Sequence, residues 1–203
     1  MLIETQYLPC IDFFIELLKS KDLTLETSEN YQKQSYRNRT KILGPHKIET
    51  LTIPVLHQEN KLITSTKIDY STPWVNIHLL SIKSAYGRSP FFEYYFHLLE
   101  KIYLQKIMHL FEFNQKLLTV CLQILDMQKE IKITEAFSKQ AVENFNDCRN
   151  LIHPKKPEHN IDIISNLSYT QTFGKVFVKN LSIIDLIFNE GKNSKQILQK
   201  NIQ

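Results

Sequence analysis

The spacing of apolar residues changes along the chain and predicts different kinds of structure in turn. Short β-rich runs come first, apolar stripes with helical spacing follow, and a short strand and a helix come last. The predicted strands are residues 2–6, 23–27, 31–43, 48–55 and 131–134, with an extended stretch at 62–70. The predicted helices begin near residues 9, 71, 89, 108 and 182. The chain therefore mixes helices and strands.

A strand, a helix and a second strand fit into about the first thirty residues. Pro9 opens the helix, whose apolar stripe includes Ile11 and Phe14. Units of this kind cross over with a right hand into parallel sheets. The next two β-rich runs flank a turn that begins at Gly44-Pro45, which predicts a hairpin. We predict an α/β fold in which an N-terminal βαβ-type mixed sheet with a β-hairpin is followed by a central helical segment and a C-terminal helix.

A length of 203 residues favours a single domain with its own core. We assign residues 1–70 to the sheet-forming part, 71–128 to the helical part and 129–191 to the closing strand and helix. The last helix is predicted to end at Gly191, because glycine terminates helices readily. Residues 192–203 are predicted to be a polar tail that frays.

The overall composition excludes several classes of protein. A net charge of +4 is too mild for a dedicated nucleic-acid binder, and four glycines without a G-x-G-x-x-G or Walker motif leave no phosphate-binding loop. The first residues lack a basic region before an apolar stretch, and no run of about 18 apolar residues follows, so we expect neither a signal peptide nor a membrane partner. Three cysteines form no even disulfide framework. We expect a reduced, soluble, cytoplasmic protein with no nucleic-acid partner.

No metal site is predicted either. Cys148, His153 and His159 do not have a spacing typical of zinc ligands. We therefore expect no bound metal, and the sequence indicates no particular cofactor.

Residues 31–41 carry the most informative charge pattern of the chain. Three cations alternate along this predicted strand and so share one face: Arg37, Arg39 and Lys41. No acidic residue lies between Glu29 and Glu49, so we expect these cations to find their anions elsewhere. Either they form a solvated strand edge that resists aggregation, or they form an anion-binding strip, since an arginine fork fits a carboxylate or a phosphate.

Polar residues also follow the first predicted strand, at the position where ligands bind in doubly wound folds. Gln6 and Tyr7 are candidates to hold a ligand there, with backbone N–H groups of the next helix directed at an anion. The alternative is an ordinary strand-to-helix turn. Cys10 lies at the same helix start and is either a nucleophile or, since no histidine is close in sequence, a small core thiol.

Two helical pairs are further candidates. His78 follows Trp74 by one turn, and on an apolar helix side it is either a satisfied core residue or a general base with a pKa tuned near neutrality. Asp185 and Asn189 lie one turn apart on the last predicted helix. They either face a site together, or Asp185 helps to cap its own helix.

With these residues in view, the chain resembles the WbqC-like protein family, in the form common in Bacteroidota. The matching segments span nearly the whole chain: residues 6–9, 31–39, 51–55 and 68–70, Trp74, His78, residues 85–86, 89–95 and 169–171, Phe173 and residues 181–191. The family name comes from surface-polysaccharide gene clusters, where transfer of glycine or another aminoacyl group to an amino sugar is suggested. The matching segments add Tyr86, Tyr169 and Gln171 to the candidate substrate-binding residues.

Two functions fit these patterns. The first is a group-transfer enzyme for an anionic small molecule, which the resemblance narrows to acyl or aminoacyl (glycine) transfer to an amino sugar in polysaccharide biosynthesis. In this enzyme His78 moves a proton, and four further residues clamp or orient the ligand: Arg37, Arg39, Gln6 and Asn38. The other candidate substrate-binding residues are Tyr7, Trp74, Tyr86, Tyr169, Gln171, Asp185 and Asn189. The second function is a non-catalytic module that binds an acidic partner, RNA or protein.

Overall fold

The structure, a computed structural model, describes residues 1–57, 59–134, 146–154 and 167–200. The predicted βαβ unit is present at its start, as β1 (Leu2–Glu4), α1 (Ile11–Lys19) and β2 (Leu23–Glu26). β1 and β2 pair in parallel, and β5 (Ile131–Ile133) pairs in parallel with β2. The resulting sheet has the strand order β1-β2-β5, and all three strands end at the same edge.

The predicted hairpin consists of β3 (Arg39–Leu43) and β4 (Ile48–Thr52), which form a separate antiparallel sheet. Side chains alternate along β3 as predicted: Thr40 is buried, whereas Arg39 and Lys41 are partly exposed. Arg37 lies before the strand begins and is buried, so it does not share the exposed face of Arg39. The N-terminal part of the chain therefore forms two small sheets.

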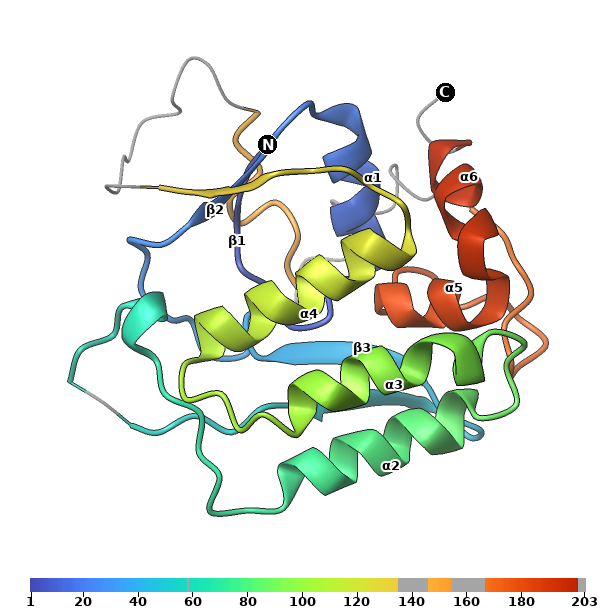
Figure 1. The fold of residues 1–203 in the computed structure, drawn as a ribbon, viewed down its shortest axis with the longest axis horizontal. Coiled ribbons are helices and arrows are strands. Elements are labelled where there is room, and N and C mark those ends of the chain that lie inside the picture. Colours follow the sequence, from blue (N-terminus) through green and yellow to red (C-terminus); the bar gives the residue numbers. More distant parts are fainter. Residues whose placement is uncertain (58, 135–145, 155–166, 201–203) are drawn as a thin grey trace.

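The central helical segment is also present, as α2 (Trp74–Tyr86), α3 (Phe92–Tyr103) and α4 (Leu110–Ile124). Figure 1 shows the parallel sheet and the hairpin in different parts of the molecule, with α4 drawn between them and α3 and α2 below. α2 packs against β3 and α3 against α4, while α5 (Ile183–Glu190) contacts all three central helices. One core therefore extends from α1 to α5.

Two segments differ from the predictions. The stretch 62–70 contains a short 3₁₀ helix, η1 (Ile63–Ser65), and pairs only through isolated bridges such as Val55 with Ile68. Residues 191–199 continue the chain as η3 (Gly191–Asn193) and α6 (Ser194–Gln199), where a fraying tail is predicted. The reason is Leu198, which is fully buried as α6 packs against α1.

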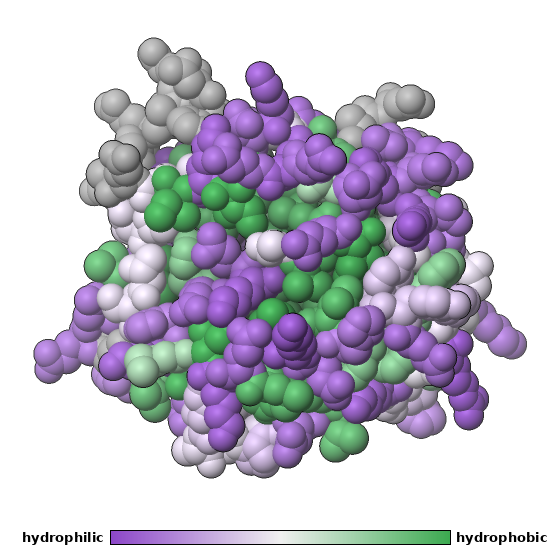
Figure 2. All heavy atoms as spheres, in the orientation of Figure 1, coloured by the Kyte–Doolittle hydropathy of each residue, from purple (hydrophilic) through white to green (hydrophobic). Residues whose placement is uncertain are grey.

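The surface is mostly polar. Figure 2 shows polar side chains over much of the face seen in Figure 1, with apolar side chains reaching the surface between them. Among the described residues, no helix combines the length and the apolar character that crossing a bilayer requires.

Candidate functional site

The twelve residues predicted from the sequence do not form one site. The structure distributes them among a buried ion pair before β3, an aromatic cluster between α1, α2 and α3, and a carboxylate cluster on α5. A basic pocket lies beside the first of these and is lined by other residues.

Arg37 binds a carboxylate of its own chain. Its Nε donates to Oε1 of Glu29 at 2.8 Å, and its Nη2 pairs with Oε2 of the same side chain. Arg37 is 1% exposed, and its backbone carbonyl accepts from the Asn114 amide at 2.7 Å. The neighbouring Asn38 donates from Nδ2 to the carbonyl of Ile53 at 2.8 Å. Arg37 and Asn38 therefore hold the approach to β3, and Arg37 is not free to clamp a ligand.

Protein groups occupy the carboxyl ends of the parallel strands, where ligands bind in doubly wound folds. Glu26, at the end of β2, pairs with Nη1 of Arg149 at 3.0 Å. Glu4, at the end of β1, accepts from the backbone N–H of Asn150 at 3.0 Å. Burial raises the pKa of Glu4, and the charge of Arg37 opposes that effect. This edge is an internal charge network.

His78 lies in an aromatic cluster with Tyr7, Trp74 and Tyr103. Its Nδ1 is 2.8 Å from the Tyr7 hydroxyl, which also bonds the Tyr103 hydroxyl, and the Trp74 and His78 rings are 5.1 Å apart. Burial lowers the pKa of His78 to about 4, although the carbonyl of Thr52 opposes this. At neutral pH the imidazole is therefore uncharged and weakly basic, which favours the alternative of a satisfied core histidine.

Near the strand-to-helix turn, Gln6 and Cys10 are also buried. The Cys10 thiol points toward Oε1 of Gln6 at 3.9 Å. Burial raises the pKa of Cys10 well above its ordinary value, and the charge of Asp12 adds to the effect. A thiol that stays protonated is a poor nucleophile, so Cys10 fits the core alternative.

The structure brings four other candidates together around Asp185. Its carboxylate accepts from the Tyr169 hydroxyl at 2.5 Å and from Nε2 of Gln171 at 3.1 Å. Burial raises the pKa of Asp185, while hydrogen bonds from Tyr169, Tyr86 and Gln171 oppose that rise. Asn189 donates to the backbone carbonyl of Asp185 at 2.8 Å. The cluster fastens the segment before α5 to that helix.

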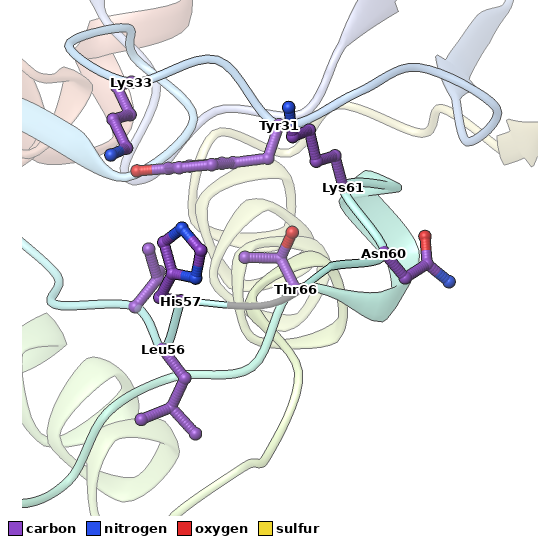
Figure 3. A pocket seen from close by; sticks show the side chains of 8 residues that line it. Tyr31, Lys33, Leu56, His57, Asn60, Lys61 and Thr66 are labelled. Atoms are coloured by element: carbon purple, nitrogen blue, oxygen red, sulfur yellow. The ribbon is translucent and has the colours of Figure 1, made fainter.

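A basic pocket of about 320 Å³ lies between the segment that follows β2 and the segment that follows β4. Its eight lining residues are Tyr31, Lys33, Val55, Leu56, His57, Asn60, Lys61 and Thr66, and none of them carries a carboxylate. Two segments far apart in sequence form the pocket, because two backbone hydrogen bonds join them. The N–H of Tyr31 donates to the carbonyl of Lys61 at 2.7 Å, and the N–H of Ile63 donates to the carbonyl of Glu29 at 2.9 Å. Figure 3 shows the Tyr31 ring across the pocket, with His57 and Thr66 on the other side.

The cations of this pocket have no anion of their own. The ammonium groups of Lys33 and Lys61 make no ion pair and no hydrogen bond with any residue that the structure describes. Arg39 lies close enough to Tyr31 for its charge to oppose the burial that raises the pKa of that phenol. The Nε of Arg39 is buried and has no hydrogen-bond partner among the described residues. Buried donors are normally satisfied, so the unpartnered Nε of Arg39 is unusual.

Sequence reasoning identified part of this pocket and missed the rest. Tyr31, Lys33 and Arg39 belong to the basic segment that the sequence singles out, although only Arg39 was a site candidate. His57 and Lys61 belong to no motif, and only the pairing of residues 29–31 with 61–63 brings them to the segment. No local signal in the sequence could have identified these two.

The described residues include no group of three or more His, Cys, Asp or Glu side chains placed to hold a metal ion. His159 lies outside the described residues.

A model of the WbqC-like protein family matches residues 5–155 and 159–197, which is nearly the whole chain. No curated protein and no solved structure shows a significant match.

Proposed function

The chain belongs to the WbqC-like protein family, and from this membership and the basic pocket we propose that it is a group-transfer enzyme for an anionic small molecule. The reaction we propose is transfer of an acyl or aminoacyl group, glycine included, to an amino sugar in surface-polysaccharide biosynthesis. One observation carries the proposal: the pocket presents two ammonium groups that make no ion pair with any described residue, and none of its lining residues carries a carboxylate. The anion is held by Lys33 and Lys61, with Arg39 close to the same pocket.

The pocket also supplies a group that can move a proton. In an acyl transfer the amine nitrogen attacks the carbonyl carbon of an activated donor, and the bond to the leaving group breaks with its electron pair on that group. The amine loses one proton as the amide forms, and imidazole is the side chain that most often accepts it. His57 lines the pocket without a partner among the described residues, whereas His78 is buried against Tyr7. We therefore assign the proton transfer to His57.

Mass spectrometry of the acceptor tests the reaction. Purified protein is incubated with amino sugars, free and nucleotide-linked, and with acyl-CoA or aminoacyl-adenylate donors. We expect the acceptor to gain the mass of the acyl group. His57→Gln should lower kcat about 100-fold or more with little change in KM, because general-base catalysis contributes about that factor. His97→Gln, at an exposed position on α3, is the matched control and should leave the rate unchanged.

Two results would change the assignment. An equal rate in His57→Gln and His97→Gln would remove His57 from the proton transfer. If anions bind the pocket but no donor yields an amide, the chain is a non-catalytic binding module, the second function that the sequence predicts.

A further inference from the structure

Resting on the proposed function, we infer that the ligand of the basic pocket carries a diphosphate, as a nucleotide-linked sugar does, and not a carboxylate. The charge of the pocket favours a diphosphate. Lys33, Lys61 and the nearby Arg39 are three cations without an acidic partner among the described residues. A carboxylate brings one negative charge and leaves most of this excess uncompensated. A diphosphate that links two organic groups brings two charges, one on each phosphoryl group.

The arrangement of the cations also favours a diphosphate. Figure 3 shows Lys33 at the hydroxyl end of Tyr31 and Lys61 near the backbone end of the same residue. In this view the two ammonium groups lie toward opposite ends of one aromatic ring, and two linked phosphoryl groups match two separated point charges. Lysine binds phosphate as a point charge, whereas an arginine fork binds a carboxylate or a phosphate through two parallel hydrogen bonds. The fork of Arg37 is already occupied by the carboxylate of Glu29.

The lining of the pocket also suits the organic part of a nucleotide-linked ligand. The Tyr31 ring and Val55 give the pocket an apolar wall, and an aromatic ring offers a face on which a base or a sugar can stack. The volume of about 320 Å³ is at the lower end of the range for small-molecule pockets, roughly 300–1,000 Å³. The pocket therefore holds the diphosphate and the group next to it.

RNA also carries phosphates, but the surroundings favour a small ligand. A protein that binds single strands tracks several successive phosphates along a basic groove. Here Lys33, Lys61 and the nearby Arg39 gather at one pocket, and the net charge of the chain is only +4.

Isothermal titration calorimetry at low salt tests the inference with five probes: inorganic pyrophosphate, uridine diphosphate, succinate, glycine and a ten-nucleotide oligouridylate. Succinate is the critical comparison because it carries two negative charges on carboxylates. We expect pyrophosphate and uridine diphosphate to bind at least about tenfold more tightly than succinate. Lys33→Ala and Lys61→Ala should each weaken the binding of pyrophosphate and of uridine diphosphate about tenfold, because each variant loses one charge-assisted contact. Lys101→Ala, an exposed lysine on α3, should change nothing.

The outcomes separate the inference from the function on which it rests. Succinate binding as tightly as the diphosphates, with the same loss in Lys33→Ala and Lys61→Ala, overturns the inference and leaves an anion site in the pocket. Binding of none of the probes overturns the anion site as well. Equal affinities in Lys61→Ala and Lys101→Ala place the ligand elsewhere, and tighter binding of the oligonucleotide than of uridine diphosphate replaces the small ligand by RNA.

Discussion

Arg37 is among the largest fully buried side chains of the protein, and its charge is balanced by the partly buried Glu29. A buried ion pair adds little net stability compared with apolar residues of similar size, because both ions lose their hydration. Removing one partner is costly, because the other charge is then left unpaired. The pair also fixes the segment between β2 and β3, which carries Tyr31 and Lys33. The side chain of Arg37 is therefore occupied in holding the segment that carries two lining residues of the basic pocket.

This role predicts a stability effect. We expect Arg37→Ala to lower the free energy of unfolding by about 3–5 kcal/mol, the cost of an uncompensated buried charge. Urea unfolding measures it, with Arg88→Ala, an exposed arginine, as the matched control that should change little. The double variant Arg37→Met with Glu29→Leu should recover most of the loss. A stable Arg37→Ala protein with weakened ligand binding would instead support the clamp that the sequence suggests.

At the residue scale, the sequence identified polar side chains correctly but not their partners. Arg37 and Glu29 lie only eight positions apart, yet the sequence pattern gave no reason to pair them across the turn between. Asp185, Tyr169 and Gln171 were all candidates, and the structure shows that they bind one another. The hydrogen-bond partner of a buried polar group depends on which residues lie beside it in the folded protein. The periodicity of the sequence carries no information about these neighbours.

At the scale of elements, the end of α5 shows how a local signal and a tertiary contact combine. Gly191 ends the helix as the sequence predicts, with φ +55°, a conformation that favours glycine. The structure adds a second reason, because a Cβ at this position would lie 2.5 Å from Cδ1 of Phe91. Gly174 has φ +86°, but a Cβ there would lie 3.6 Å from the carbonyl oxygen of Val176, an ordinary van der Waals contact. The two glycines therefore separate backbone strain from steric overlap.

We expect Gly174→Ala to cost about 1 kcal/mol, the strain of a positive φ alone. Gly191→Ala should cost more, about 2–3 kcal/mol, because the Phe91 ring must also move. Thermal unfolding of both variants measures the difference. Equal losses would mean that Phe91 yields freely and that only the backbone conformation requires glycine at the end of α5.

Most elements could be predicted because their signals are local. The strand-helix-strand opening, the hairpin and the central helices each have a periodic apolar pattern within one segment. α6 was missed because a six-residue helix with one fully buried leucine has too short a pattern, and it depends on the surface that α1 offers. The pocket was missed for a similar reason, since the pairing of residues 29–31 with 61–63 creates it.

At the scale of the whole molecule, two buried groups with opposite pKa shifts influence how stability depends on pH. Burial raises the pKa of Asp12 from 3.8 to about 8, with the charge of Glu16 adding to the rise and Asn180 and Lys19 opposing it. Burial lowers the pKa of His78 from 6.5 to about 4. The stability linked to Asp12 is fully present below pH 3.8 and is lost as the pH rises to about 8. The stability linked to His78 is present above pH 6.5 and is lost as the pH falls to about 4.

Between pH 4 and 6.5 the two groups change the free energy of unfolding in opposite directions, each by about 1.4 kcal/mol per pH unit. Between pH 6.5 and 8 only the effect of Asp12 remains. We expect Asp12→Asn to remove the loss of stability from pH 6.5 to 8 and to expose the rise that His78 causes from pH 4 to 6.5. His78→Asn, which keeps a polar atom near the Tyr7 hydroxyl, should expose the opposite slope, a fall from pH 4 to 8. Urea unfolding at intervals of half a pH unit measures these changes in the free energy of unfolding. Burial also raises the pKa values of Glu4, Glu29 and Asp185, but their contributions cancel when each variant is compared with wild type. Parallel profiles for wild type and Asp12→Asn would show that Asp12 is ionised in the folded protein, with a counterion or water reaching into the core beside α1.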